Sequence, residues 1–270
     1  AIDLSHFQTL GRKLKLHTTK NTPNLDGVRI ALFGVLELRN SSDCIENSFN
    51  LNQIRESFYG LFPGNWSSQI ADLGDVAMGA TVNDSYFAVS EIVKNLLQQN
   101  IIPVIIGGSQ DITYANYRAY DNVKPMINIV NVDKSFDLGD SSKPISNNSY
   151  IGKVVLDKPY NLFNYTTLGL QTYYNSQEEI DLMEKLYFEY NRLGALKGDI
   201  KNVEPAMRDA DLVTVDLNSI KSSEVSTKQK FSPNGFDGSE ICAISRYAGI
   251  SNKVSSFGIY EYKPSNDDQA

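Results

Sequence analysis

The sequence predicts an α/β protein with three layers, in which helices cover both faces of a mostly parallel central sheet. Short runs of β-branched and other apolar residues alternate with longer segments whose apolar residues recur every three or four positions. Most of the short runs are apolar throughout, which is typical of strands that are buried on both faces. Strand, helix and strand in repetition favours right-handed crossovers and therefore a parallel sheet.

The first half of the chain supplies three of the expected strands, which are VRIALFGV at 28–35, IIPVIIG at 101–107 and INIVNV at 127–132. Between the first two, residues 84–100 carry apolar side chains at helical spacing and predict a helix. Residues 134–165 are rich in Ser, Asn and Pro. They predict a long excursion from the sheet, with a small hairpin near 150–157.

The second half supplies three more strands, TTLGL at 166–170, LVTVDL at 212–217 and VSSFGIY at 254–260. Helical spacing of apolar residues predicts three further helices, at 176–191, 201–210 and 238–249. Ser176 followed by Glu179 predicts a capping box at the start of the first of these helices. Because no internal repeat and no linker stands out, we expect one domain that spans residues 1–270.

Composition and charge narrow the function classes. The chain has 270 residues, 41% of them hydrophobic, and a net charge of −7. An acidic chain has no electrostatic attraction to nucleic acid or anionic lipid, so neither is expected as a partner. No apolar stretch approaches the length that spans a bilayer. Cys44 and Cys242 have no CxxC spacing, which favours free thiols in a reducing compartment and hence a cytoplasmic location.

Three stretches place polar residues directly after an apolar strand: IGGSQD at 106–111, NVDKSFDL at 131–138 and TVDLNS at 214–219. In a parallel sheet these strand ends meet at one edge, so Asp133, Asp137 and Asp216 are expected to share a cleft. Converging carboxylates repel each other unless a cation, a proton or a basic partner compensates. A hard cation with oxygen ligands is one explanation. The alternative is that the three aspartates cap helices or close turns, with Lys134 and nearby amides balancing their charge.

The position of the histidines excludes several chemistries. The chain has only His6 and His17, and both precede the first predicted strand. A Ser–His–Asp triad would require the N-terminal segment to fold over the cleft, and IGGSQD lacks the final Gly of a nucleophile elbow. No strand end offers an imidazole ligand. A Walker A loop and a GxGxxG segment after the first strand are also absent from the sequence.

In their order along the chain, these stretches resemble the ureohydrolase superfamily, which comprises arginase, agmatinase and formimidoylglutamase-like proteins. GVLELRNS resembles the family's Gly-Val-Pro-Glu segment, and ADLGDV at 71–76 resembles its Asp-Leu-Gly stretch. GLQTYYNSQEEIDLMEKLYF and RLGALKGDIKNVEPAMRDADL are similar to the formimidoylglutamase-like branch, and SPNGFDGSEICAISRYAG to the segment after the last metal motif. The resemblance implies an arginase-like fold over most of the chain. It also implies a final helix after the last strand, which this chain is expected to lack.

The resemblance implies a centre of two manganese ions, whose six ligand positions fall on Gln110, Asp133, Ser135, Asp137, Asp216 and Asn218. Three aspartates match, while Gln110 and Ser135 stand in place of the two histidines and Asn218 in place of an aspartate. No bound metal, or at most one divalent ion (Mg, Ca or Mn), is therefore expected. The ammonium of Lys134 would replace a cation if it pointed inward. The family carboxylate that binds the amino end of the substrate falls on Glu240.

The substituted ligands favour a pseudoenzyme that has lost its dinuclear centre and acts as a protein-binding or scaffold component. A protein partner or a homo-oligomer is then expected. Two alternatives remain open. The first is a metal-dependent hydrolase of linear guanidino or formimino C–N bonds. The second is a small-molecule sensor, in which Glu240 and the aspartates recognise a cationic ligand.

Overall fold

A computed structural model describes residues 6–42, 50–65, 67–140, 143–225 and 232–262. Within these residues, nine strands form one sheet in the order β1-β3-β2-β4-β9-β8-β5-β6-β7, and all neighbouring strands pair in parallel. The strands are β1 (Lys15–Leu16), β2 (Val28–Val35), β3 (Gln69–Val76), β4 (Ile102–Ile106), β5 (Ile127–Val132), β6 (Leu162–Leu170), β7 (Glu189–Arg192), β8 (Leu212–Asp216) and β9 (Ser256–Tyr260). The predicted α/β fold with a parallel central sheet is confirmed.

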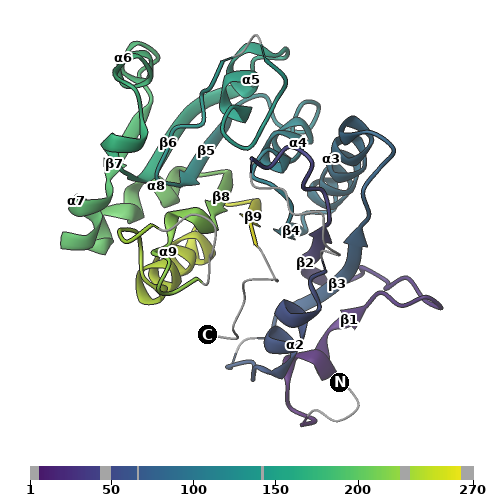
Figure 1. Ribbon diagram of the computed structural model, residues 1–270. Helices are drawn as coiled ribbons and strands as arrows, with labels where there is room; N and C mark the ends of the chain where they lie inside the picture. The colour runs from purple at the N-terminus through teal and green to yellow at the C-terminus, as the bar shows by residue number, and fades with distance from the viewer. Residues whose placement is uncertain (1–5, 43–49, 66, 141–142, 226–231, 263–270) are drawn as a thin grey trace.

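Helices cover both faces of this sheet (Figure 1). The α-helices are α1 (Leu10–Lys13), α2 (Asn52–Gly60), α3 (Val82–Gln98), α4 (Ile112–Arg118), α5 (Tyr150–Leu156), α6 (Gln177–Lys185), α7 (Leu193–Gly198), α8 (Glu204–Asp209) and α9 (Gly238–Ile250). Short 3₁₀ segments are η2 (Thr172–Tyr174), η3 (Ile200–Val203) and η4 (Leu217–Ser219). Helices α3, α4 and α5 pack on one face, and α7, α8 and α9 pack on the other. The helices and the sheet between them make up the three layers.

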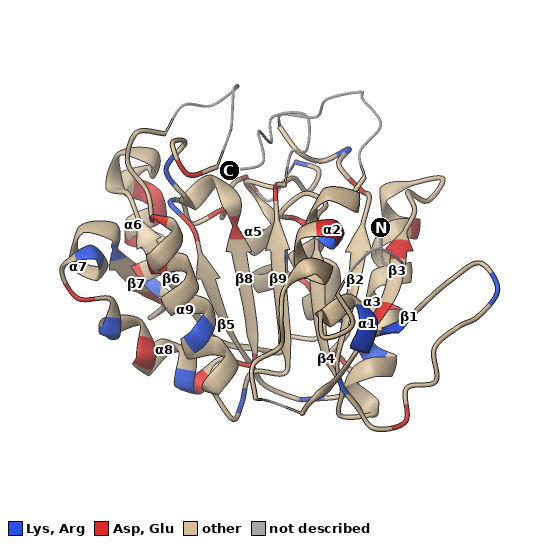
Figure 2. Cartoon of the chain, turned by 90° about the horizontal axis from the view of Figure 1, so that it is seen from below, with Lys and Arg blue, Asp and Glu red and all other residues tan. Residues whose placement is uncertain are grey.

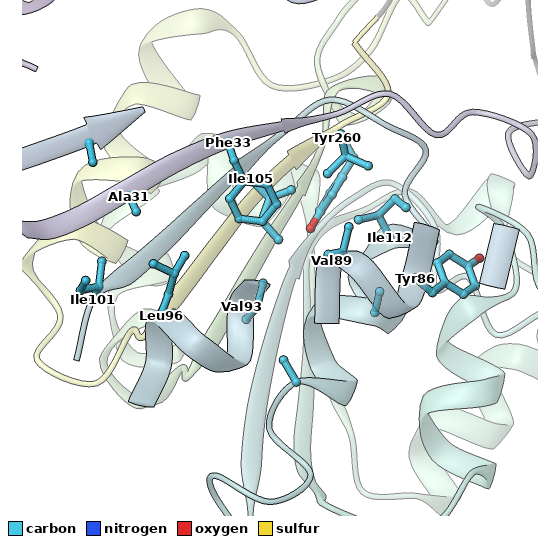
Figure 3. Close-up of a cluster of buried hydrophobic side chains, with 14 of the residues drawn as sticks. Ala31, Phe33, Tyr86, Val89, Val93, Leu96, Ile101, Ile105, Ile112 and Tyr260 are labelled. Atoms are coloured by element: carbon cyan, nitrogen blue, oxygen red, sulfur yellow. The ribbon is translucent and has the colours of Figure 1, made fainter. Parts of the chain in front are cut away.

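The core beneath the first face joins α3 to the middle of the sheet (Figure 3). Val89 and Val93 of α3 are fully buried and pack in one cluster with Phe33 of β2 and Ile105 of β4. Tyr260, the last residue of β9, belongs to the same cluster. Burial of each such side chain contributes about 1.5–3 kcal/mol. This packing fixes the carboxyl ends of β4 and β9 side by side.

The side chains of β5 and β8 point alternately to the two faces of the sheet, which decides which residues face α4 and α5. Val130 and Val132 of β5 and Val213 and Val215 of β8 belong to the cluster under α7, α8 and α9. Side chains of a strand alternate between faces, so the residues between them point to the opposite face. Asn131 and Asp133 of the β5 strand and its end therefore lie on the α4 side, as do Thr214 and Asp216 of β8. A polar row thus runs to the carboxyl edge on that side.

The four strands at the middle of the sheet are β4, β9, β8 and β5. Because all four are parallel, their carboxyl ends meet at one edge, where open α/β sheets hold their ligands. The three polar stretches expected from the sequence follow β4, β5 and β8, so the structure brings them to this edge. Figure 2 shows the strands side by side, with most charged residues on the surrounding helices and loops.

Two predicted elements differ from the structure, and the strand β3 was not predicted. The hairpin expected near 150–157 is wrong, because this segment is the helix α5, with Ile151 and Val154 buried against α4. The helix expected at 176–191 ends at Lys185, after which Tyr187 takes a positive φ of 57° and the chain enters β7. The segment ADLGDV, which the sequence analysis treated only as a motif, is the body of β3. No helix among the described residues has both the length and the apolar character needed to cross a membrane.

Candidate functional site

The three aspartates singled out in the sequence lie together at the carboxyl edge. Asp133 follows β5 directly, Asp137 lies four residues further on, and Asp216 ends β8, which pairs with β5. Their exposed fractions are 0%, 3% and 7%. Asp133 and Asp216 therefore end neighbouring strands, and all three carboxylates are withdrawn from water. That the three share one cleft stays a prediction.

Asp133 and Asp137 each have one oxygen held by hydrogen bonds and one left free. Asp133 Oδ1 accepts from the backbone N–H groups of Lys134 at 2.5 Å and Ser135 at 3.3 Å. Asp137 Oδ1 accepts from the Ser135 hydroxyl at 2.8 Å. Asp133 Oδ2 and Asp137 Oδ2 are buried and have no hydrogen-bond partner. A buried polar atom without a partner costs about 1–3 kcal/mol, and more when it is charged, so these two oxygens need a proton or a cation.

Gln110, at the first of the substituted ligand positions, shows the same arrangement. Its Nε2 lies 3.1 Å from each of three acceptors, Asn131 Oδ1, Tyr150 OH and Thr214 Oγ1. Asn131 and Thr214 stand two residues before Asp133 and Asp216 on the same face, so the amide lies directly beneath the acids. The Gln110 side chain is fully buried, and its Oε1 has no hydrogen-bond partner.

The electrostatics of the acid cluster favour neutral carboxyl groups in the absence of a cation. Burial raises the pKa of Asp133 well above its usual value, and the charge of Asp137 adds to this shift. Burial also raises the pKa of Asp137, to about 7, and the Asp216 charge adds to it. The pKa of Asp216 is raised by burial, then by Asp133 and by Glu261. Carboxylates withdrawn from water and close to one another cannot all stay ionised unless positive charge joins them.

At the other two substituted positions, the side chain of Ser135 and the backbone of Asn218 make hydrogen bonds to the acids. The Ser135 hydroxyl donates to Asp137, and the backbone N–H of Asn218 donates to Asp216 Oδ1 at 2.6 Å. The Lys134 ammonium lies over the ring of Tyr174, 4.8 Å from its centroid. Among the described residues, Lys134 makes no ion pair with the acids, although its charge partly offsets the raised pKa of Asp216.

Glu240 lies on α9 and makes hydrogen bonds to the start of that helix and to α7. It is the third residue of the helix and closes a capping box with Asp237. Its Oε2 also accepts from Lys197 Nζ of α7 at 2.7 Å. The structure thus gives Glu240 a role in the start of α9, and its role in substrate binding stays a prediction.

Glu261 is a site residue that the sequence analysis missed. It follows β9 directly, is 2% exposed, and has a positive φ of 62°. Its Oε1 accepts from the backbone N–H of Gln110 at 3.0 Å and from Asn147 Nδ2 at 3.3 Å, and Oε2 accepts from the Ser41 hydroxyl at 3.1 Å. The only available signal was an acid directly after the strand 254–260, in the position that Asp133 takes after β5.

Two glycines allow the strand ends to approach each other. Gly107 and Gly108 have φ of 81° and 79°, which L side chains rarely adopt. A Cβ at Gly108 would lie 3.2 Å from the carbonyl oxygen of Glu37, and the Glu261 N–H donates to the Gly108 carbonyl at 2.9 Å. The backbones of the two strand ends therefore approach closely at Gly108, which places Gln110 next to Glu261.

The remaining candidates lie elsewhere or outside the described residues. His6 and His17 are exposed, and His17 donates its backbone N–H to Asp72 of β3, near the far edge of the sheet. Cys242 is a free, exposed thiol on α9, and Cys44 lies outside the described residues. Within the described part of the chain, no set of three or more His, Cys, Asp or Glu side chains converges closely enough to hold a metal ion. Any metal at this edge would thus need other ligands, such as the Gln110 oxygen.

Comparison with known proteins identifies the family. Residues 27–270 match the sequence profile of the Arginase family. The match covers most of the chain, and the nine-stranded parallel sheet agrees with it. The chain therefore belongs to the arginase family.

Formimidoylglutamases are among the most similar curated relatives. The protein from Staphylococcus haemolyticus is 25% identical over 97% of this chain and 86% of its own length. The protein from Clostridium tetani is 23% identical over 74% of this chain, and the alignment spans 64% of its own length, just under two-thirds. Identity at this level leaves the activity and substrate of this chain to be proposed.

Solved structures agree on the fold. Formimidoylglutamase from Bacillus subtilis superposes with a TM-score of 0.81, 18% identity, and coverage of 96% of this chain and 85% of that one. Trypanosoma cruzi formiminoglutamase with Mn²⁺ gives a TM-score of 0.79, 16% identity, and coverage of 91% and 89%. An asparagine-to-histidine variant of the latter was also solved with Mn²⁺. These similarities confirm the arginase-like three-layer fold and the resemblance to formimidoylglutamases.

The same comparisons bear on the function expected from the sequence. They support the hydrolase alternative more than the pseudoenzyme that the sequence analysis placed first, since the relatives carry the names of hydrolases. The expectation of no bound metal is not supported, because structural relatives bind Mn²⁺.

Proposed function

We propose that this protein is a divalent-metal-dependent hydrolase of linear C–N bonds of the formimino or guanidino kind. The observation that carries the proposal is the pair of buried carboxylate oxygens, Asp133 Oδ2 and Asp137 Oδ2, that have no hydrogen-bond partner at the carboxyl edge of the sheet. Membership of the arginase family and the formimidoylglutamase relatives supply the reaction class.

The donor set suits a single ion better than two. By the resemblance to the family, the first ion would have Asp133, Asp137 and Asp216 as ligands, with Gln110 in place of a histidine. Of these four side chains, Gln110, Asp133 and Asp137 each have a buried oxygen with no hydrogen-bond partner. A second ion would share Asp133 and Asp216 and would otherwise find only neutral side chains, Ser135 and Asn218. The Ser135 hydroxyl already donates to Asp137, and the side chain of Asn218 carries no charge. We therefore propose one bound ion in place of two.

The side chains around this ion would bind and orient the substrate. When bound, a divalent ion acts as a Lewis acid and makes water a stronger acid. The positive charge of a bound ion would favour the ionised form of Asp216, and the carboxylates of Asp216 and Glu261, both buried, would then attract a cationic amidine or guanidine end. Glu261 is fixed by three hydrogen bonds, so it would offer its charge without reorganisation. Both histidines lie away from this edge, and proton transfer would fall to carboxyl groups.

A product-release assay tests the proposal. The purified protein is stripped with a chelator, reloaded with Mg²⁺, Ca²⁺ or Mn²⁺, and incubated with formiminoglutamate, arginine or agmatine. Release of formamide, ammonia or urea that depends on the ion is expected, and Asp133→Asn should abolish it. Glu204→Gln, which removes an exposed carboxylate on α8 paired to Arg208, should leave the rate unchanged. Absence of release from every substrate, with the folded structure intact by circular dichroism, would contradict the proposal.

A binding protein without turnover is the second candidate function. The observation that favours it is that two side chains at substituted ligand positions make hydrogen bonds within the protein. Gln110 Nε2 lies next to three internal oxygen atoms, and the Ser135 hydroxyl donates to Asp137. The ligand would be a protein partner, another copy of the chain, or a small cation held by the acids. Thermal-shift measurements with arginine, agmatine and formiminoglutamate test for a small-molecule ligand. Sedimentation analysis tests for an oligomer, and fractionation of native cells tests the proposed cytoplasmic location. Stabilisation by a ligand without product release would favour this candidate.

A further inference from the structure

The carboxyl edge holds three buried oxygens with no hydrogen-bond partner: Gln110 Oε1, Asp133 Oδ2 and Asp137 Oδ2. Gln110 comes from the turn after β4, and the two acids come from the turn after β5. The side chains are 0%, 0% and 3% exposed, so bulk water does not reach them. A cation would satisfy buried acceptors of this kind.

The other polar atoms of these three side chains are held in place. Asp133 Oδ1 and Asp137 Oδ1 are bonded by donors from the 134–135 segment. Asn131 Oδ1 can only accept a hydrogen bond, so it requires the nitrogen of the Gln110 amide and leaves the amide oxygen as the free atom. Asn131 is itself oriented, because its Nδ2 donates to the Tyr165 hydroxyl, whose proton goes to the Phe136 carbonyl. Hydrogen bonds of this kind orient the ligands of metal sites.

The same contacts place the three oxygens in one region. Ser135 joins the two acids, because its backbone N–H donates to Asp133 Oδ1 at 3.3 Å and its hydroxyl donates to Asp137 Oδ1 at 2.8 Å. The Gln110 amide is bonded to Asn131, which stands two residues before Asp133 on the same face of β5. These hydrogen bonds place the amide next to the end of β5, from which both carboxylates come.

The geometry points to a mononuclear, oxygen-only site at Gln110, Asp133 and Asp137 that takes one hard divalent cation, with Gln110 lowering the affinity for Mn²⁺ relative to Mg²⁺. Amide and carboxylate oxygens are the ligands of hard cations, whereas an imidazole at the Gln110 position would favour transition metals. With only three protein ligands the ion would keep waters in its remaining positions, as Mg²⁺ commonly does. This inference rests on the proposed function and deepens it. Because ion binding is measured without turnover, the ion site and the hydrolase activity can each be refuted separately.

Calorimetric titration of the chelator-treated protein with MgCl₂, CaCl₂ and MnCl₂ tests the inference. A stoichiometry of one is expected for each ion. Gln110→His should change the ratio of the Mn²⁺ and Mg²⁺ dissociation constants by about tenfold or more in favour of Mn²⁺. Asp137→Asn should weaken all three ions by about tenfold or more, while Glu204→Gln should change none.

Three results would overturn the inference. One is a stoichiometry of two for the unaltered protein. Another is the absence of binding at millimolar ion, which would mean that a proton satisfies the two acids. The third is an unchanged ratio in Gln110→His when circular dichroism shows that the variant is folded. Gln110→Glu provides a second variant that keeps an oxygen ligand. It should strengthen Mg²⁺ and Mn²⁺ alike and leave their ratio within about threefold of the unaltered protein.

Discussion

Glu37 shows how one buried charge is held next to the site. It is fully buried and receives hydrogen bonds from Arg39 Nη2 at 2.6 Å and the Ser85 hydroxyl at 2.7 Å. Burial alone would raise the pKa of Glu37, but these donors outweigh it and the pKa is lowered. A lowered pKa stabilises the fold above the pKa of the unfolded chain, and this contribution is lost as the pH falls through the folded value.

Glu37→Gln is therefore expected to lower the free energy of unfolding at pH 7 by about 1–3 kcal/mol. The difference from the unaltered protein should keep its full size down to the unfolded pKa of about 4.3, and it should shrink as the pH falls further toward the lowered folded pKa. Urea denaturation at pH 7 and at a series of pH values below about 4 measures this. A difference that stays constant down to the lowest pH at which the protein is folded would contradict the ionic account of Glu37.

Gly169 of β6 is a second residue on which the site depends. Its φ is 100°, and a Cβ there would lie 2.4 Å from Phe236 Cε2 and 3.3 Å from the carbonyl oxygen of Asp133. Gly169→Ala is expected to lower the free energy of unfolding by about 2–4 kcal/mol, from backbone strain and overpacking together. Gly194→Ala is the matched control, because a Cβ at Gly194 of α7 meets nothing within 4 Å. Equal denaturation midpoints for the two variants would refute this explanation.

At the scale of residues, the sequence predicts the positions of the aspartates better than the hydrogen bonds around them. Asp133 and Asp216 follow apolar strands, and parallel strands must end at one edge, so their meeting follows from pattern alone. The orientation of the Gln110 amide does not, because it is set by Asn131, Tyr150 and Thr214, which belong to three other elements. Glu261 was missed for a similar reason: its partners come from distant segments, and the sequence shows only one acid after a strand.

At the scale of elements, the turn after β5 depends on the turn after β6. Asn175 Nδ2 donates to the Lys134 carbonyl at 3.1 Å, and Asn175 Oδ1 accepts from the Phe136 N–H at 2.9 Å. The Gln171 N–H also donates to the Lys134 carbonyl, at 3.0 Å. The segment that carries Asp133 and Asp137 is thus fastened to the end of β6 by backbone and side chain together.

Asn175→Ala removes the two side-chain hydrogen bonds that join Asn175 to the turn after β5. We expect the affinity for the divalent ion to fall about tenfold, because the turn that orients both carboxylates is loosened. Calorimetric titration with Mg²⁺ measures the change. Asn95→Ala on α3, which removes an exposed side chain bonded only within its own helix, serves as the control. If both variants bind the ion as tightly as the unaltered protein, Asn175 does not support the site.

The elements found from the sequence are those with strong local patterns. The runs at 28–35 and 127–132 match β2 and β5 in both bounds, and the capping box at Ser176 is present. The segments at 69–76 and 189–192 mix apolar and polar residues, since β3 and β7 lie near the edges of the sheet and are only partly buried. Helix α5 is short and follows a polar stretch. Its few apolar residues therefore fit the spacing of a helix and of a hairpin equally well, and the sequence pattern could not distinguish the two.

At the scale of the whole molecule, binding of an ion is expected to stabilise the fold. Charged residues lie mostly on the outer helices and loops (Figure 2). The three acids at the carboxyl edge are buried, and none of them belongs to an ion pair among the described residues. An ion that binds only the folded state adds about 2.7 kcal/mol at a hundredfold excess over its dissociation constant. The melting temperature should therefore rise by about 5–10 °C.

Differential scanning fluorimetry with and without saturating Mg²⁺ measures this shift, and a chelator should reverse it. Asp133→Asn should show no shift, because it removes the carboxylate charge at the centre of the cluster. A rise of the same size in Asp133→Asn would place the stabilising ion elsewhere on the acidic surface.

The most direct test is a crystal structure grown with Mn²⁺ and measured for anomalous scattering at the manganese edge. Mn²⁺ is the probe because Mg²⁺ gives no usable anomalous signal, and the oxygen ligands admit either ion. One anomalous peak is predicted, in contact with Gln110, Asp133 and Asp137. Two peaks bridged by Asp133 and Asp216, or no peak at this edge, would contradict the account.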